Sequence, residues 1–328
     1  MPTFGIALPV RNRKAFTLAI LQQLTDQIIR QVAVGNLQRQ DIQIVVVDDD
    51  SSDGTPEQIE SQFPVVHLLR GDGDLWWTGA IAKAMTYLTS IVKTDYIIWL
   101  NDDITLADDF IYQVLQHCQT PDEKVLIGGV ITAQRHSDWI VFGGVISGQL
   151  INDVSQFEQP VLAVDALNGN IAILPTRVVA DIGLPDVQRF RHYGGDFEYV
   201  CRAKENGYRV QLSSGLRATT DYSLADVIRY MPPWIQWATS SSFADKLSVL
   251  KSLTSRRSPH NVEHMVNSIH RSRTEVPAWK YGTFYFRKLV KIIGSEIVPM
   301  SVKQARIRAY FRRRNVPSEV AKSVLNQP

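Results

Sequence analysis

The chain has 328 residues, of which 45% are hydrophobic and 21% charged, so it can bury a sizeable core and global disorder is not expected. Its two cysteines, Cys118 and Cys201, are too few for a disulfide scaffold or a cysteine-based zinc site. No apolar run is long enough for a transmembrane helix, and the first ten residues lack the features of a signal peptide. We therefore expect a cytoplasmic protein.

The net charge of +2 conceals an uneven distribution. Residues 1–270 hold 22 Lys and Arg against 30 Asp and Glu, whereas residues 271–328 hold 13 against 3. The segment 280–314 also interleaves aromatic and aliphatic residues with the basic ones, which is the composition of a helix lying on an anionic membrane surface. A helical appendage packed on the core has the same composition. Nucleic acid is not expected as a partner, because the body is acidic.

The first hundred residues alternate β-rich runs with helical patterns. We predict strands at residues 3–9, 42–47, 65–69 and 95–100. We predict helices at residues 14–34, from Thr55 onward and at 78–92, with Thr55 and Thr78 as N-caps. This order predicts an α/β fold with a mostly parallel central sheet, right-handed crossovers and a ligand site beyond the carboxyl ends of the strands.

The pattern changes in the second half of the chain. We predict further strands at residues 125–132, 139–147, 166–175 and 208–212, and helices at 176–182 and 195–206. From about residue 225 onward the pattern is helical, basic and aromatic, with prolines as breaks. The sequence therefore predicts an α/β body followed by a helical extension.

Acidic clusters follow two of the predicted strands. Asp48 comes directly after an apolar run, where a carboxylate is costly without a partner, so it can accept hydrogen bonds from a base or ribose. Asp102 and Asp103 follow Asn101 directly after the predicted strand 95–100, and adjacent carboxylates suit Mg²⁺ or Mn²⁺. The alternative for both clusters is a turn that caps the next helix.

Two further motifs carry chemistry. Asp196 opens a helix whose N-terminal potential keeps its carboxylate ionised and available as a base, unless it is an ordinary N-cap. Glu198 lies about 200° around that helix and is expected to pair with Arg202. Trp76 and Trp77 can form an apolar wall for a base or sugar, or can both be core. The absence of a G-x-G-x-x-G fingerprint disfavours an NAD dehydrogenase.

Taken together, six stretches resemble the family-2 glycosyltransferases with a GT-A fold, over roughly residues 3–215. They are LPVRNR (8–13), VVVDDDSSDGT (45–55), GDGDLWWTGA (71–80), IIWLNDDITL (97–106), ALNGNIAILP (166–175) and YGGDFEYVCRAKENGY (193–208). The third is most similar to a rhamnosyltransferase-like subgroup. The resemblance implies a glycosyltransferase domain at 1–224, with a nucleotide-binding part at about 1–105 and an acceptor-binding part at about 106–224. Residues 225–328 would form the helical, basic C-terminal extension.

The resemblance also implies residue roles. Asp196 would be the catalytic base. The metal ion, Mg²⁺ or Mn²⁺, would be held by Asp103 and Asp102, with Asp221 in place of the histidine found in many relatives. The residues expected at the nucleotide sugar are Pro9, Arg11, Asp48, Asp50, Gly73, Trp76, Trp77, Asp102 and Asn168. Asn101 and Gly195 depart from the family pattern, where acids are usual.

The implied function is inverting transfer of a sugar from a UDP- or dTDP-sugar to an acceptor hydroxyl. The acceptor would be a glycan or a lipid-linked molecule in polysaccharide, O-antigen or other cell-surface glycan synthesis, with the enzyme peripheral at the inner face of the cell membrane. Two alternatives remain open. One is a non-catalytic nucleotide-sugar-binding protein. The other is a nucleotidyltransferase of related fold, although the stretch PVRNRKAF lacks the glycine-rich phosphate loop expected there.

Overall fold

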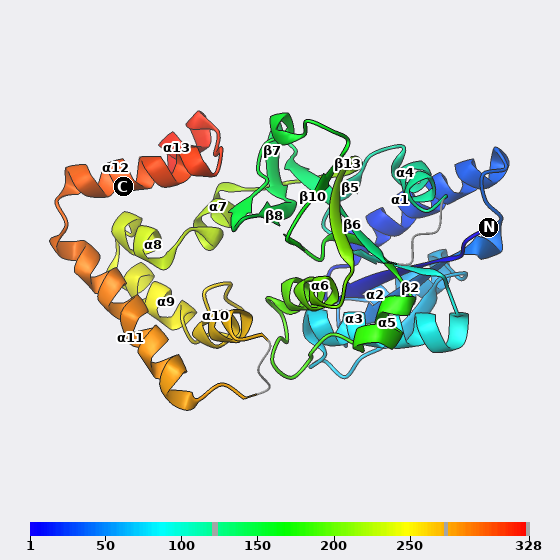
Figure 1. Cartoon of the computed structure of the whole chain (residues 1–328), viewed down its shortest axis with the longest axis horizontal. Coiled ribbons are helices and arrows are strands. Elements are labelled where there is room, and N and C mark those ends of the chain that lie inside the picture. The colour runs from blue at the N-terminus through cyan, green and yellow to red at the C-terminus, as the bar shows by residue number, and fades with distance from the viewer. Residues whose placement is uncertain (120–123, 272–274, 326–328) are drawn as a thin grey trace. The chain divides into compact units, whose positions relative to one another are not determined.

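A computed structural model describes residues 1–119, 124–271 and 275–325 of the chain (Figure 1). The chain divides into two compact units: residues 1–191 with 195–221 form the first, and residues 192–194 with the chain from 222 onward form the second. The sequence prediction divides the chain at 224/225. The short segment 192–194, which the second unit includes, has no signal in the sequence pattern.

A ten-stranded sheet forms the centre of the first unit. Its strands are β1 (Phe4–Val10), β2 (Ile42–Asp48), β3 (His67–Arg70), β4 (Tyr96–Leu100), β5 (Thr105–Leu106), β6 (Val125–Ala133), β7 (His136–Phe142), β10 (Val161–Ala163), β12 (Ile171–Pro175) and β13 (Arg209–Thr220). The main order is β10-β13-β6-β12-β4-β1-β2-β3, with β5 paired to β13 and β7 to β6. A second, three-stranded sheet consists of β8 (Gly144–Ile146), β9 (Gln149–Leu150) and β11 (Ala166–Leu167).

The predicted α/β class with a mostly parallel sheet is confirmed. Strands β1 to β4 are mutually parallel where they pair, and β13 runs parallel to β6. Strand β12 is antiparallel to both β4 and β6, so it is the reversed strand in the middle of the sheet. The carboxyl ends of β1, β2 and β4 therefore lie at one edge, next to the start of β12.

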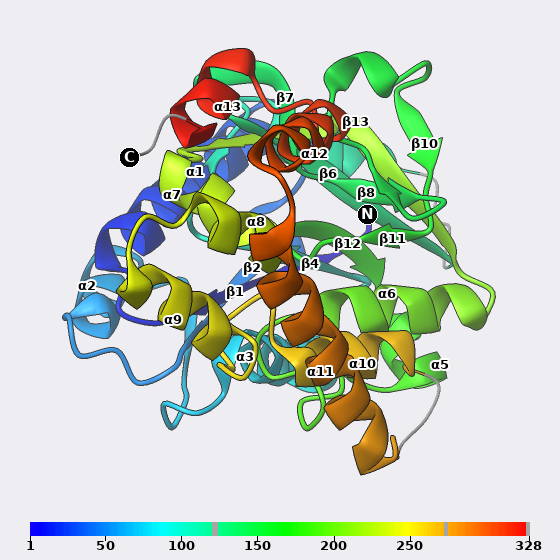
Figure 2. The ribbon, with the colours of Figure 1, turned by 90° about the vertical axis from the view of Figure 1, so that its left-hand side faces the viewer.

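The strands bury both faces, which explains their near-continuous apolar sequences. In β2, Ile44 and Val46 face one core, and Val45 and Val47 face the other. The helices of the first unit are α1 (Lys14–Ala33), α2 (Thr55–Gln62), α3 (Trp76–Tyr87), α4 (Phe110–His117), α5 (Arg177–Ile182) and α6 (Gly195–Glu205). Helices α1, α2 and α4 cover the first face, and α3, α5 and α6 cover the second (Figures 1 and 2).

The predicted N-caps of two helices are wrong. Helix α2 begins at Thr55 after an N-cap at Gly54, and Asp53 accepts the backbone N–H of Thr55 at 3.1 Å. Helix α3 begins at Trp76, so Thr78 lies inside it. The cause in the second case is a distant carboxylate: Asp49 accepts the backbone N–H of Trp76 at 3.0 Å. Local sequence cannot reveal a cap that comes from another loop.

The second unit is helical in its described part. Its helices are α7 (Leu224–Tyr230), α8 (Pro233–Thr239), α9 (Phe243–Ser252), α10 (Val262–Ile269), α11 (Ala278–Gly294), α12 (Met300–Arg313) and α13 (Ser318–Leu325). A small core of its own, with Val249, Leu253, Val266 and Ile292 at its centre, holds α9, α10 and α11 together. In the described residues, no helix combines the length and the apolar character that crossing a membrane requires.

Histidines of the second unit are held in surroundings that disfavour their charged form. Burial, together with Arg229, His264 and Arg257, lowers the pKa of His192 to about 4. Burial also lowers the pKa of His260 and of His264. These side chains are therefore neutral in the folded unit at pH values where they would be protonated in an unfolded chain.

The second unit should lose stability in mild acid. Between pH 6.5 and about 4 the unfolded chain binds a proton at His192 and the folded unit does not, so the free energy of unfolding falls as the pH falls. The shift corresponds to about 3 kcal/mol, complete near pH 4. Urea unfolding between pH 7.5 and 4.5 should show this loss, and His192→Gln should make it smaller. The control His136→Gln, in the first unit, should leave the loss unchanged. If the unfolding free energy depended on pH equally in the two variants, the prediction would be contradicted.

Candidate active site

The acidic clusters lie at one edge of the sheet, as their positions after parallel strands predict. Asp48 is the last residue of β2, and Asn101 follows the last residue of β4. Strand β1 lies between them, so the two strand ends are two strand spacings apart, about 10 Å. This separation is of the size that a nucleoside diphosphate can bridge.

Asp48 has one carboxylate oxygen without a partner. The side chain is buried, and its Oδ2 accepts the backbone N–H of Ser51 at 3.1 Å. Its Oδ1 is also buried, and no described residue makes a hydrogen bond to it. A buried carboxylate oxygen without a donor is costly, so its arrangement favours a ligand that brings an N–H or O–H.

Asp49, which the sequence analysis did not single out, organises the neighbouring loop. Its buried carboxylate accepts the backbone N–H groups of Gly73 at 2.9 Å, Leu75 at 3.2 Å and Trp76 at 3.0 Å. These contacts hold Trp76 at a φ of +57°, a conformation that bulky residues rarely adopt. Gly71 fits closely here, since a Cβ on it would lie 2.6 Å from Asp49 Oδ1. Asp49 is therefore part of the scaffold of the loop.

Arg11, Asp50 and Gly73 come together at the same edge. The Arg11 guanidinium donates to the carbonyl oxygen of Gly73. A Cβ added to Gly73 would lie 3.3 Å from both Arg11 Nη2 and Asp50 Oδ2. Pro9 precedes this group on β1, opposite Val47 of β2. The predicted nucleotide-contacting residues of β1, of the β2 loop and of the loop before α3 are thus neighbours.

The two tryptophans have different surroundings, and both are partly exposed. Trp76 donates its indole N–H to Asp74 at 2.9 Å. Trp77 donates its indole N–H to Asn101 Oδ1 at 2.9 Å and meets the Trp99 ring edge-on, with centroids 5.7 Å apart. Trp77 therefore links the start of α3 to the end of β4.

The turn 168–170 connects three parts of the site. Asn170 makes both a side-chain and a backbone hydrogen bond with Asn101. Asn168 donates to the carbonyl oxygen of Gly143 and accepts the backbone N–H of Asn170, so its amide is used within the protein. Gly169 lies between Trp77 and Asp196, because an added Cβ would overlap the indole ring and lie 3.0 Å from the Asp196 Cβ. Only glycine fits there.

Asp196 lies in the first turn of α6, and its carboxylate accepts the backbone N–H of Gly169 at 2.7 Å. Burial raises the pKa of Asp196, and backbone hydrogen bonds from Phe197 and Gly169 oppose the rise. A raised pKa makes the carboxylate a better proton acceptor. Glu198, by contrast, is buried and paired with Arg202 at 2.7 Å, which fits the structural role expected for it.

Asp102 and Asp103 share one arginine but differ in exposure. Arg13 Nε lies 2.8 Å from Asp102 Oδ1, and Arg13 Nη2 lies 3.0 Å from Asp103 Oδ2. Asp102 is buried and also accepts the hydroxyl of Thr17 at 2.9 Å, so both its oxygens are occupied. Burial raises the pKa of Asp102 to about 6. The side chain of Asp103 is 45% exposed, which leaves it accessible to a ligand.

These contacts bear on the predicted metal ligands. No group of three or more His, Cys, Asp or Glu side chains among the described residues is arranged to hold a metal ion. Asp103 fits a hard cation, whereas Asp102 is directed to Arg13 and Thr17. Asp221 is exposed directly after Thr220, whose hydroxyl donates to the backbone carbonyl of Asp103 at 2.9 Å. Such a partial set suits a cation that takes its remaining ligands from water and substrate phosphates.

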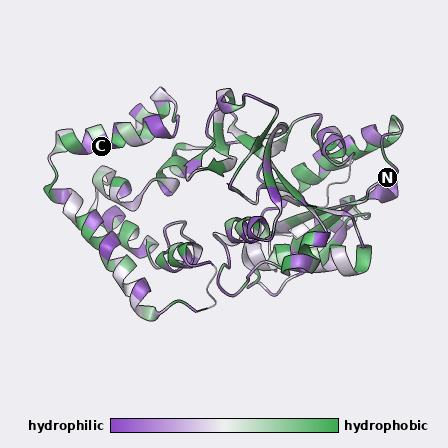
Figure 3. Cartoon of the chain, viewed as in Figure 1, coloured by the Kyte–Doolittle hydropathy of each residue, from purple (hydrophilic) through white to green (hydrophobic). Residues whose placement is uncertain are grey.

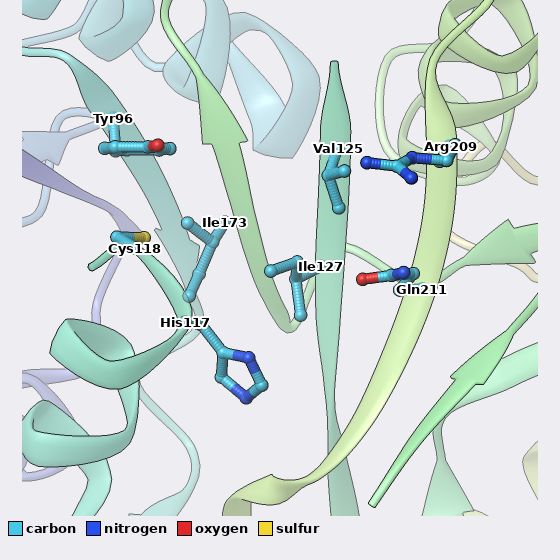
Figure 4. Close-up of a pocket in the computed structure, with 8 residues that line it drawn as sticks. All are labelled: Tyr96, His117, Cys118, Val125, Ile127, Ile173, Arg209 and Gln211. Carbon is cyan, nitrogen blue, oxygen red and sulfur yellow. The ribbon is translucent and has the colours of Figure 1, made fainter. Parts of the chain in front are cut away.

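A separate cavity of about 190 Å³ lies elsewhere in the first unit, among residues from the starts of β4, β6 and β13 and the end of α4 (Figure 4). Tyr96, Val125 and Arg209 mark those strand starts, and His117 and Cys118 come from α4. Its lining includes none of the predicted site residues. Because ligands of parallel α/β sheets bind at the carboxyl ends, we assign this cavity no part in the site.

Comparisons with known proteins concern the family and the fold. Residues 6–159 match the family model of glycosyl transferase family 2. Among solved structures, the mannosyltransferase PcManGT from Pyrobaculum calidifontis, in complex with GDP-Man and Mn²⁺, is similar with a TM-score of 0.51 and 14% identity, over 99% of this chain and 78% of that one. The structure of GalNAc-T7 with UDP, GalNAc and Mn²⁺ is similar with a TM-score of 0.50 and 13% sequence identity, over 88% of this chain and 54% of that one. At such identities the likeness establishes the fold alone.

The fold and the family match define a glycosyltransferase. Residues 6–159 of the chain belong to the family-2 glycosyltransferases, and the fold is of the GT-A type. No curated protein sequence matches the chain significantly. The rhamnosyltransferase-like subgroup is not distinguished by these comparisons.

The close packing at Gly169 gives a prediction for this site. Gly169→Ala should displace Trp77 or Asp196, because the new Cβ overlaps the indole ring. We expect at least a tenfold loss of transfer activity and a shift of tryptophan fluorescence, with the fold retained by circular dichroism. Gly282→Ala, where nothing lies within 4 Å of the added Cβ, is the control and should change neither. Full activity of Gly169→Ala would show that the site tolerates a wider turn.

Proposed function

We propose that the enzyme transfers a sugar from a UDP- or dTDP-sugar to an acceptor hydroxyl with inversion at the anomeric carbon, and that Asp196 is the catalytic base. The observation that carries the proposal is the continuous set of contacts from Asp196 through Gly169 and Asn170 to Asn101. This set of contacts joins the half-buried Asp196 carboxylate, whose pKa is raised, to the acidic edge of the sheet.

The reaction is a direct displacement. Asp196 accepts the proton of the acceptor hydroxyl while its oxygen forms a bond to the anomeric carbon. The bond from that carbon to the nucleoside diphosphate breaks on the opposite face, and the electron pair leaves with the diphosphate oxygen. Because Gly169 holds the carboxylate at a fixed place, the base needs little reorganisation as the proton moves.

The departing diphosphate requires positive charge. Asp103, together with Asp221, which follows the Thr220 that bonds to the Asp103 backbone, would hold Mg²⁺ or Mn²⁺, which when bound neutralises charge on the diphosphate. Arg13 keeps Asp103 in place and holds Asp102 away from solvent. Arg11, fixed on the loop at Gly73, adds a second positive charge near the predicted nucleotide contacts Pro9 and Asp50.

The proposed choice of nucleotide follows from Asp48. Its single oxygen without a partner matches a ring that offers one N–H, as the N3–H of uracil or thymine does. Guanine offers two adjacent N–H groups, of which one would compete with the Ser51 N–H for the second oxygen. The predicted contacts of Gly73, Trp76, Trp77 and the turn at Asn168 would surround the sugar and diphosphate.

The acceptor is proposed to be a glycan or a lipid-linked molecule of the cell surface. The support is the charge of residues 271–328, 13 basic against 3 acidic, together with the exposed apolar side chains on the described helices of this segment. Such helices bind anionic membrane surfaces at the depth of the headgroups. We therefore propose peripheral association with the inner face of the cell membrane.

The base and the metal ligand can be tested separately. Asp196→Asn should lower kcat by at least a hundredfold with little change in donor affinity, because the amide cannot accept the proton. Asp103→Ala should lower activity and weaken the dependence on added Mn²⁺. The control Asp108→Ala removes an exposed carboxylate close to Asp103 in the sequence and should remain active. Activity near the parent's in Asp196→Asn would remove the proposed mechanism.

The nucleotide assignment has its own test. Asp48→Asn should weaken UDP binding by about ten- to a hundredfold, since a hydrogen bond to a charged acceptor is worth about 1.5–3 kcal/mol. GDP binding, measured by calorimetry on the same variant, should change less. The control Asp26→Asn makes the same change at an exposed carboxylate of α1 that is not among the predicted contacts, and it should leave UDP binding unchanged. An equal loss for both nucleotides would contradict the base-reading role of Asp48.

A further inference from the structure

A cavity of about 500 Å³ lies within the second unit, a size typical of small-molecule sites. Helices α8, α11 and α12, with the segment between the last two, provide its walls. Its aromatic members are Trp234 and Tyr310, and its charged members are Lys291, Arg306 and Arg313. The catalytic proposal does not use any of them.

The charge of this cavity is of one sign. Three of its ten lining residues are cationic and none is acidic. The acid closest to it along the chain, Glu296, accepts the indole N–H of Trp237 at 2.6 Å and pairs with Lys246 and Lys303. The lining therefore carries a formal excess of positive charge beside aromatic and aliphatic side chains, and Lys291 Nζ lies 6.0 Å from the centroid of the Trp234 ring. This combination favours an anionic group attached to an apolar body.

An exposed apolar stripe on α11 continues from the cavity. Phe286, Val290 and Ile293 recur at helical spacing on one side of the helix and are 65%, 54% and 54% exposed. Trp279, at 66%, extends the stripe toward the start of the helix. Val290 belongs to both features, since it also lines the cavity. Figure 3 shows hydrophobic and hydrophilic residues side by side along α11.

We infer that this cavity binds the phosphate headgroup of an anionic lipid, with the hydrocarbon chain along the stripe of α11. The inference rests on the proposed membrane association of the second unit and specifies the partner and the residues. The phosphate oxygens pair with Lys291, Arg306 and Arg313. Val290 lies at the boundary between the cavity, which binds the headgroup, and the apolar stripe, which contacts the hydrocarbon chain. The unit thus recognises a particular lipid group in addition to the general negative charge of the surface.

The test compares two pairs of substitutions with the same change of charge on the same helix. Arg306→Gln/Arg313→Gln removes two cavity cations, and Arg308→Gln/Arg312→Gln removes two exposed cations of α12 that do not line the cavity. Binding of the full chain to phosphatidylcholine vesicles with and without phosphatidylglycerol is measured by flotation, without any sugar donor. We expect the cavity pair to weaken binding to the anionic vesicles about tenfold more than the control pair.

Equal weakening by the two pairs would overturn the inference and leave diffuse attraction to the membrane. Absence of binding by the parent chain would overturn both the inference and the proposed membrane association, while the assay of Asp196→Asn still tests the transfer reaction. If the cavity pair does not fold, Lys291→Gln on α11 against the control Arg287→Gln makes the same comparison. Soluble dihexanoyl phosphatidylglycerol should compete with the vesicles; equal competition by inorganic phosphate would overturn the lipid assignment.

Discussion

The hydrogen bond from the Gly169 backbone N–H to the Asp196 carboxylate is the contact on which the candidate active site depends. It fixes the start of α6 against the turn before the reversed strand β12, and Asn170 in that turn is bonded to Asn101. Position 169 has no space for a side chain, since the Trp77 indole is already there. One residue without a Cβ therefore allows a helix, a strand end and an aromatic side chain to meet at one edge of the sheet.

The carboxylates at this edge serve two different purposes. Asp49, Asp53 and Asp102 have their oxygens directed to backbone N–H groups, hydroxyls or Arg13, so they hold loops and helix starts in place. Asp48, by contrast, has a buried oxygen to which no described residue makes a hydrogen bond, and the side chain of Asp103 is exposed. Leaving this Asp48 oxygen buried without a ligand is costly in free energy. The edge thus combines acids whose oxygens are bonded within the protein with acids that can still accept a ligand.

Much of this arrangement could be predicted from the sequence, and the rest depends on distant contacts. The run 42–47 is too uniformly apolar for a half-exposed strand, and this pattern alone predicts that Asp48 lies at the functional edge of the sheet. The start of α3 could not be predicted, because its first N–H groups are satisfied by Asp49, more than twenty residues away. The inward direction of Asp102 depends on Thr17, 85 residues away. Sequence patterns reveal strand ends, but not which of the adjacent acids finds an internal partner.

The charge distribution distinguishes residues 271–328, the last part of the second unit, from the rest of the chain. Residues 1–270 carry more acidic than basic groups, so on their own they would be repelled by an anionic surface. Residues 271–328 carry the opposite excess, and this excess exceeds that of the body. This excess already counts their three acids, of which Glu296 is paired with Lys246 and Lys303. The acidic edge of the sheet lies in the first unit, whereas helices α11 to α13, which carry most of this basic excess, belong to the second unit, so the two kinds of charge are on different parts of the chain.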